Sequence, residues 1–420
     1  MKTRRVAALL CSLLPILLTI TNAPVKAADP PQQLEQWLAD HKLSAETLPQ
    51  LQQQPFATSA LSAAEATAAG ETLWNARREQ LRETRRAEFE SRVITLDGRK
   101  MPFWYEVFGE APADGRRLFI SMHGGGGAPA RVNDQQYENQ KRLYAPQEGV
   151  YLVPRAPTNT WNLWHEAHVD RFFDRLITDM IVFENVNPDR VYIMGYSAGG
   201  DGVYQLAPRM ADRLAAAAMM AGHPNETQPD GLRNLPFTIH MGAEDAAYRR
   251  NKIAAEWKVK LKELQQADPD GYQHEVVLHI GRGHWMKLQD RVAVPWMAGF
   301  ERRRFPQRIV WQQDDVTHER FYWLQVDRAK AAGRPRIVAT KTGNTVTIEQ
   351  ADVGELTILA NDDVFNLSQP LTVRHADREL FRGTVPRTIF ALAQSLLDRD
   401  DPRLVFSAGV TVTLPKPAAK

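Results

Sequence analysis

The residues best suited to chemistry form a short turn bounded by glycines. Ser197 stands at the centre of Gly195-Tyr196-Ser197-Ala198-Gly199, which directly follows the apolar run 191–194. A turn this tight leaves no room for side chains at its flanks, so glycine is required there and the serine hydroxyl is left exposed at the tip. Such a serine is typical of a nucleophile in covalent catalysis. A chain of this length contains the pentapeptide by chance about one time in ten. The neighbouring sequence must therefore show whether Ser197 is a nucleophile.

Two further residues are predicted to complete the site. Asp245 follows the apolar run 237–241, and His284 follows the run 276–280. The carboxyl ends of parallel strands share one edge of a sheet, so we expect Ser197, Asp245 and His284 to meet there. The imidazole would take the serine proton and return it to the leaving group, while the aspartate fixes the tautomer. Glu244 is the alternative acid.

A glycine-rich segment is the candidate for stabilising negative charge. His123-Gly124-Gly125-Gly126-Gly127 follows the apolar run 118–122. Backbone N–H groups without a neighbouring side chain can approach a developing oxyanion closely. We predict Gly125, Gly126 and Ala198 as the donors. The alternative is a flexible glycine linker.

Several aromatic residues follow strands at the same predicted edge. The expected substrate-binding side chains are His123, Trp161, Trp164, His165, His223 and Trp285. They would suit an aromatic or sugar-like substrate, although packing beneath the loops is an equally good interpretation for Trp161, Trp164 and His223. His165 and His168 lie three residues apart, whereas a zinc-binding helix spaces its histidines by four. We therefore expect no metal.

Eight short apolar runs indicate a central sheet. They comprise residues 93–96, 103–107, 118–122, 151–153, 191–194, 216–220, 237–241 and 276–280. The first two are joined by a predicted hairpin, and helical patterns at 169–184, 199–208, 249–265 and 291–302 separate the later ones. An antiparallel start followed by alternating strands and helices predicts an α/β fold, with a mostly parallel sheet covered on both faces.

The chain divides into four parts by composition. Residues 1–27 have a basic start, an apolar stretch broken by Pro15 and a small-residue cleavage site near Ala27, as in a signal peptide, which predicts a secreted or periplasmic protein. Residues 28–90 are predicted to form a helical extension and 91–304 the α/β domain. Residues 305–420 carry short alternating segments typical of a small β-rich accessory domain.

Composition narrows the possible functions. The 420 residues are 43% hydrophobic and 24% charged, as in ordinary globular proteins. The single cysteine, Cys11, lies in the predicted leader, so the mature chain has no thiol for a disulfide or a cysteine nucleophile. Loss of the leader with its four basic residues changes the formal charge from +2 to −2. Neither nucleic acid binding nor a membrane span after leader removal is expected.

Residues 91–304 resemble secreted α/β-hydrolases of the polyhydroxybutyrate-depolymerase and feruloyl-esterase-like branch. The resemblance rests on His123-Gly124-Gly125-Gly126, on residues 187–200 around Ser197, and on Gly283-His284-Trp285. It implies an eight-stranded α/β-hydrolase sheet and hydrolysis of carboxylic esters through an acyl-enzyme without a cofactor. The ester could be polysaccharide-linked, an aryl ester or a polyester; the oligomeric state is not indicated.

Two other functions compete with ester hydrolysis. A serine peptidase of the prolyl-oligopeptidase type has the same triad order, but it usually carries a large β-propeller that residues 28–90 cannot build. A non-catalytic binding protein on a hydrolase scaffold is the third possibility. The complete set of Ser197, Asp245, His284 and the glycine-rich segment argues against it.

Overall fold

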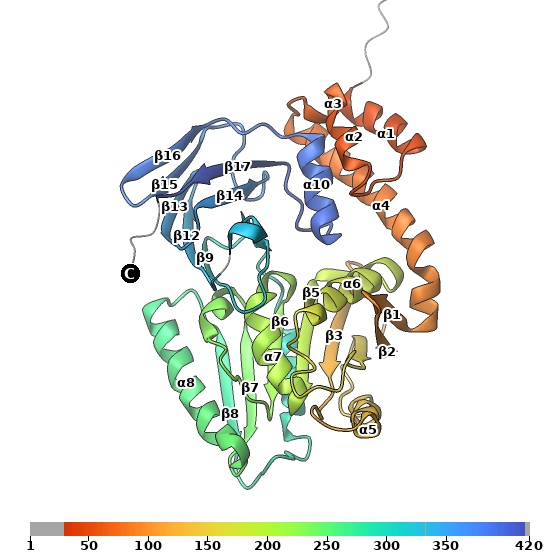
Figure 1. Ribbon diagram of the computed structural model, residues 1–420, viewed down its shortest axis with the longest axis vertical. Helices are drawn as coiled ribbons and strands as arrows, with labels where there is room; N and C mark the ends of the chain where they lie inside the picture. Colours follow the sequence, from red (N-terminus) through yellow and green to blue (C-terminus); the bar gives the residue numbers. More distant parts are fainter. Residues whose placement is uncertain (1–28, 332, 416–420) are drawn as a thin grey trace, which may run out of the picture.

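A computed structural model describes residues 29–331 and 333–415, so the predicted signal peptide lies outside the described residues (Figure 1). The centre of the molecule is a sheet of eight strands. They are β1 (Val93–Leu96), β2 (Arg99–Phe108), β3 (Arg116–Met122), β4 (Gly149–Pro154), β5 (Val186–Tyr196), β6 (Ala216–Met220), β7 (Phe237–Gly242) and β8 (His274–His279).

The strand order of this sheet is β1-β2-β4-β3-β5-β6-β7-β8. β2 runs antiparallel to both of its neighbours, and every pairing from β4 to β8 is parallel. Each of the eight predicted apolar runs falls on one of these strands. The predicted α/β-hydrolase fold is therefore confirmed.

Both faces of the sheet are covered, as its alternating side chains require. Along β5, Val191 and Ile193 enter one apolar core while Tyr192 and Met194 enter another on the opposite face. The helices of this domain are α5 (Ala130–Gln140), α6 (His168–Phe183), α7 (Ala198–Arg209), α8 (Arg250–Ala267) and α9 (Ala293–Ala298). The first core is covered by α6, α7 and α8, and the second by α9.

Two helices differ from the sequence prediction. The helix expected over 291–302 is only Ala293–Ala298, preceded by the 3-10 turn η4 (Gln289–Val292) and followed by Gly299. Pro295 fits only in the first turn of a helix and Gly299 favours its end, so the helical pattern overestimated the length. No helix was predicted at α5, because its residues are mostly polar and give no clear apolar stripe.

The N-terminal segment is helical, as predicted. It contains α1 (Pro30–Asp40), α2 (Leu48–Gln52), α3 (Pro55–Thr58) and the long α4 (Ala63–Ser91). A capping box between Ser62 and Glu65 starts α4, because each side chain accepts a hydrogen bond from the other residue's backbone N–H. Arg92, in the left-handed conformation, ends it.

The C-terminal segment is rich in strands, as predicted. Its elements are β9 (Arg308–Gln312), β10 (Arg320–Phe321), β11 (Leu324–Gln325), β12 (Arg336–Thr342), β13 (Thr345–Ala351), β14 (Glu355–Ala360), β15 (Leu371–His375), β16 (Arg378–Gly383), α10 (Ile389–Arg399) and β17 (Ala408–Thr413). They form one sheet in the order β10-β11-β14-β17 and another in the order β16-β15-β13-β12-β9. Further 3-10 turns are η1 (Ala211–Arg213), η2 (Pro229–Asn234), η3 (Ala247–Arg249) and η5 (Arg328–Lys330).

The two outer segments pack on each other and on the α/β domain. α10 shares an apolar core with α1 to α4. Arg302 donates hydrogen bonds to Asp189 of the α/β domain and to Asp401 beyond α10, and all three are buried. Figure 1 shows both segments above the central sheet, whereas α5 lies at its lower end, where β3 finishes. Among the described residues, no helix is long and apolar enough to cross a bilayer.

Candidate active site

Ser197 occupies a strained turn between β5 and α7. Its backbone has φ 57° and ψ −120°, a conformation that L-residues rarely adopt. A Cβ on Gly195 would lie 2.2 Å from the carbonyl oxygen of Gly199, and one on Gly199 would lie 2.1 Å from that of Met122. The turn therefore closes only with glycine at both flanks. The Ser197 N–H donates to Met220 O at 2.9 Å, which fixes the turn to β6.

The structure brings the three predicted side chains together. His284 Nε2 lies 3.0 Å from Ser197 Oγ, and His284 Nδ1 lies 2.7 Å from Asp245 Oδ2. These distances are within reach of proton transfer. Asp245 is buried, whereas the His284 side chain is 44% exposed. The alternative acid, Glu244, is exposed and is not the partner of the imidazole.

The glycine-rich segment passes directly beside the serine. A Cβ on Gly124 would lie 3.2 Å from Ser197 Cβ. Within the described chain, no acceptor binds the N–H of Gly125 or that of Ala198, the first residue of α7. The N–H of Gly126 instead donates to Asn133 Oδ1 at 2.8 Å. Gly126 is therefore not a free donor as predicted, which leaves Gly125 and Ala198.

Asn133 is a residue that the sequence analysis missed. It is buried on α5, and its Nδ2 donates to Ala128 O at 3.2 Å and to Asn159 Oδ1 at 3.0 Å. Together with the bond from Gly126, these contacts link the glycine-rich segment to the loop after β4. An Asn six residues beyond a glycine run, within a polar helix, gives no pattern that identifies it in advance.

His123 and Trp164 are wrongly predicted to bind substrate. Both side chains are fully buried. The His123 ring donates from Nδ1 to Gly124 O at 2.6 Å and accepts from the Ala156 N–H at 3.2 Å, and burial lowers the pKa of His123 to about 3. Trp164 Nε1 donates to His123 O at 2.8 Å. Both residues support the glycine-rich segment from beneath.

The other predicted substrate-binding residues lie on the loops around the candidate site, called the rim below. Trp161 is 63% exposed beside the glycine-rich segment, since a Cβ on Gly126 would lie 3.0 Å from Trp161 O. Trp285 is 47% exposed and directly follows His284, so the two exposed indoles come from different loops. His165 and His223 are half-buried, and burial lowers the pKa of each.

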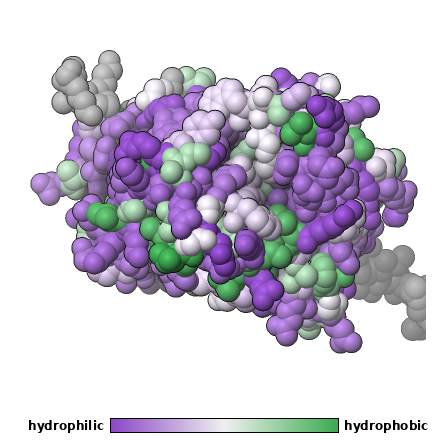
Figure 2. Space-filling view, turned by 90° about the horizontal axis from the view of Figure 1, so that it is seen from below, coloured by the Kyte–Doolittle hydropathy of each residue, from purple (hydrophilic) through white to green (hydrophobic). Residues whose placement is uncertain are grey.

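Two exposed apolar side chains on nearby loops were not predicted. Tyr248 lies in η3 after β7, where its ring is 4.7 Å from the Arg250 guanidinium, and Ile280 follows β8. Both are exposed. Figure 2 shows the molecule from this end, where apolar residues form several separate patches among polar ones. The rim is therefore an open surface of mixed polar and apolar residues.

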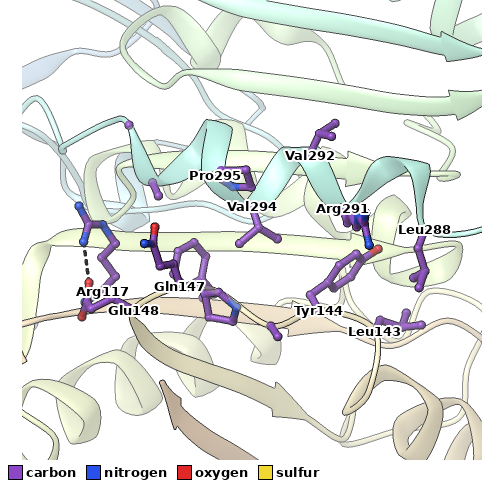
Figure 3. A pocket seen from close by; sticks show the side chains of 15 residues that line it. Arg117, Leu143, Tyr144, Gln147, Glu148, Leu288, Arg291, Val292, Val294 and Pro295 are labelled. Atoms are coloured by element: carbon purple, nitrogen blue, oxygen red, sulfur yellow. Dashed lines mark hydrogen bonds and ion pairs between the residues drawn. The ribbon is translucent and has the colours of Figure 1, made fainter. Parts of the chain in front are cut away.

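The carboxylate cluster and the cavity described here both lie away from Ser197, Asp245 and His284. Among the described residues, the carboxylates of Glu226, Asp314 and Asp315 approach one another within 4.8 Å, and none belongs to the predicted site. A cavity of about 750 Å³ lies between α9 and residues 143–148, with the Arg117–Glu148 ion pair at one end (Figure 3). No triad residue lines it.

Comparison with known proteins places the similarity in the α/β domain. The profile of the dienelactone hydrolase family matches residues 146–290, a span that includes all three triad residues. The putative esterase NocK of Nocardia uniformis subsp. tsuyamanensis is 29% identical over 153 residues, which cover 34% of this chain and 44% of NocK. The chain thus matches less than half the length of that relative.

Solved structures show partial similarity. A thermostable esterase has a TM-score of 0.40 and 17% identity, covering 50% of this chain and 62% of its own. A feruloyl esterase module from Clostridium thermocellum, complexed with sinapinate, has a TM-score of 0.35 and 14% identity, covering 48% and 83%. The family match and NocK bear out the resemblance to esterases with the α/β-hydrolase fold.

Proposed function

We propose that this protein is an exported serine hydrolase that cleaves carboxylic esters through an acyl-enzyme on Ser197. The observation that carries the proposal is the hydrogen-bonded chain from Ser197 through His284 to Asp245 at the end of a strained turn. The similarity to the dienelactone hydrolase family and to NocK supports an ester as the substrate. Export rests on residues 1–27 alone.

The geometry supports a two-step reaction. Ser197 Oγ attacks the ester carbonyl while His284 Nε2 takes its proton, and the resulting oxyanion accepts hydrogen bonds from the N–H groups of Gly125 and Ala198. Collapse of this intermediate breaks the bond to the alcohol, which leaves with the proton from His284. Water, deprotonated by the same imidazole, then releases the acid. Asp245 keeps the imidazole in the required tautomer and stabilises the imidazolium.

The rim favours an aryl or polymer-linked ester. Trp161, beside the glycine-rich segment, and Trp285, next to His284, offer exposed aromatic side chains, and the exposed His284 ring indicates a site open to solvent. Aromatic rings provide large apolar contact areas for an aryl group or a sugar. Polysaccharide-linked, aryl and polyester substrates therefore remain the proposed classes.

The peptidase alternative has less support. Residues 30–91 contain α1 to α4, with no strand among them, so this part of the chain supplies no β-propeller. An assay of p-nitrophenyl esters, feruloyl esters and Pro- and Ala-p-nitroanilides tests the preference directly. Hydrolysis of the amides but not the esters would overturn the proposal.

The role of Ser197 is tested with one substitution and a matched control. Ser197→Ala is expected to abolish ester turnover and labelling by a fluorophosphonate, with the melting temperature nearly unchanged. Ser91→Ala alters a serine at the end of α4 and is expected to leave turnover and labelling intact. Turnover that survives in Ser197→Ala, or a wild type that neither labels nor turns over, would contradict the proposal. The second result would favour a non-catalytic binding protein.

A further inference from the structure

The loop that carries His284 has few side-chain contacts around Gly281 and Gly283. A Cβ on Gly281 or Gly283 would meet no atom within 4 Å, and Ile280 is 84% exposed. Glycine residues in open space leave the backbone free to adopt many conformations. Asp245 restrains the ring of His284, but the main chain around it needs separate anchors. One is the bond from the Glu244 N–H to Arg282 O at 2.8 Å.

Tyr196 supplies the second anchor with a single hydroxyl group. This hydroxyl donates to the carbonyl oxygen of His284 at 2.7 Å and accepts from the Met286 N–H at 2.9 Å. A phenol has one proton to donate and lone pairs to accept, so one group satisfies both peptide units on either side of Trp285. The Tyr196 ring also lies 6.1 Å from the His284 ring and 5.6 Å from Trp285, centroid to centroid.

The protonation state of Tyr196 suits this double contact. The residue is buried, and burial raises the pKa of its hydroxyl above the usual range, so the group keeps the proton that it donates. Both hydrogen-bond partners of the hydroxyl are backbone groups of the loop. The hydroxyl therefore acts as a fixed bracket between β5 and the loop.

The position of Tyr196 in the chain links the nucleophile to the loop of His284. It is the last residue of β5 and directly precedes Ser197, and it pairs in register with Met220 of β6. The strand that holds the nucleophile thus also holds the loop of the base. We propose that Tyr196 is a positioning residue, which fixes His284 against Ser197 by bracketing His284 O and the Met286 N–H. This inference rests on the proposed function.

The test is Tyr196→Phe, which keeps the ring and removes both hydrogen bonds. Displacement of a catalytic group by about 1 Å can lower turnover by 10²-fold. We expect kcat for a p-nitrophenyl ester to fall by about 10- to 100-fold, with KM changed little, because the aromatic rim is intact. A purely structural hydroxyl would lower the melting temperature without this separation of kcat from KM.

Tyr192→Phe is the matched control. Tyr192 is also on β5, and its hydroxyl donates to a backbone carbonyl, that of Phe300, at 2.8 Å. Tyr192→Phe should therefore lose comparable stability and keep the wild-type kcat. Equal kcat values for the two variants would overturn the positioning role while wild-type turnover leaves the proposed function standing. A wild type without turnover would instead remove the proposed function.

Hydrogen exchange keeps the inference testable if Tyr196→Phe does not fold. The Met286 N–H is held by the Tyr196 hydroxyl, so we expect slow exchange of this amide in the wild-type protein. Exchange of Met286 as fast as that of an exposed loop amide would show that the bracket is open in solution. That outcome would overturn the proposal without any variant.

Discussion

Asn133 offers the sharpest test of how the glycine-rich segment is held. Its side chain makes three hydrogen bonds, accepting from Gly126 and donating to Ala128 O and Asn159 Oδ1. Asn133→Ala removes all three. At about 1 kcal/mol for each bond, the free energy of unfolding should fall by about 3 kcal/mol. A Cβ on Gly125 would approach Asn133 Oδ1 within 2.2 Å, so this side chain also shapes the turn around the predicted donor.

Asn133→Ala should lower turnover by more than the loss of folded protein explains. Removal of one oxyanion donor typically lowers kcat by about 10²- to 10³-fold. Displacement of the Gly125 N–H should cause a substantial part of that decrease in kcat, so we expect kcat to fall by at least about 10-fold. The assay is p-nitrophenyl ester hydrolysis at a temperature where unfolding curves show the variant to be folded.

The control for this prediction lies on the same helix. Asn139, also on α5, is exposed and its Oδ1 only accepts from Gln135 at 3.0 Å. Asn139→Ala should change both stability and kcat little. An unchanged or raised kcat in folded Asn133→Ala would refute the reasoning, because a freed Gly126 N–H would then be as good a donor as the arrangement seen here.

Two further predictions concern the scaffold. Truncation after Arg304 removes Asp401, the buried partner of Arg302, and breaking a buried ion pair costs about 3–5 kcal/mol. The helices α1 to α4 also lose their contact with α10. We therefore expect the truncated chain to be insoluble or to lack a cooperative thermal transition by circular dichroism. Burial raises the pKa of Asp179 to about 6, so the folded state binds this proton before the unfolded chain does and the carboxyl favours folding as the pH falls from about 6 to 4. Asp179→Asn should steepen the loss of stability over that interval by about 1.4 kcal/mol per pH unit, measured by urea unfolding, and an unchanged slope would contradict the assignment.

Much of the fold could be predicted because its signals are local. The strands β3 to β7 are largely buried on both faces, so each appears in the sequence as a continuous apolar run. The helices α6, α7 and α8 carry the expected periodicity. The predictions were poorer for α5, which lies over the sheet with a mostly polar sequence, and for α9, where Pro295 and Gly299 shorten the helix.

The errors in the site share one cause. His123, Trp164 and Gly126 were assigned from their place after a strand at the correct edge, yet a residue's position does not give the direction of its side chain or N–H group. His123 and Trp164 point into the core. The Gly126 N–H donates to the side chain of Asn133, a residue from a different element.

The sequence by itself determined that Ser197, Asp245 and His284 should meet, because parallel strands deliver their carboxyl ends to one edge and Gly195 and Gly199 permit a turn that no other residues allow. Only the tertiary structure decided which groups around them are free to act. Gly125 is left available while Gly126 is occupied, and the Tyr196 hydroxyl closes on the loop of His284. These outcomes depend on hydrogen bonds between residues distant in the chain, whose directions are set by packing rather than by local spacing.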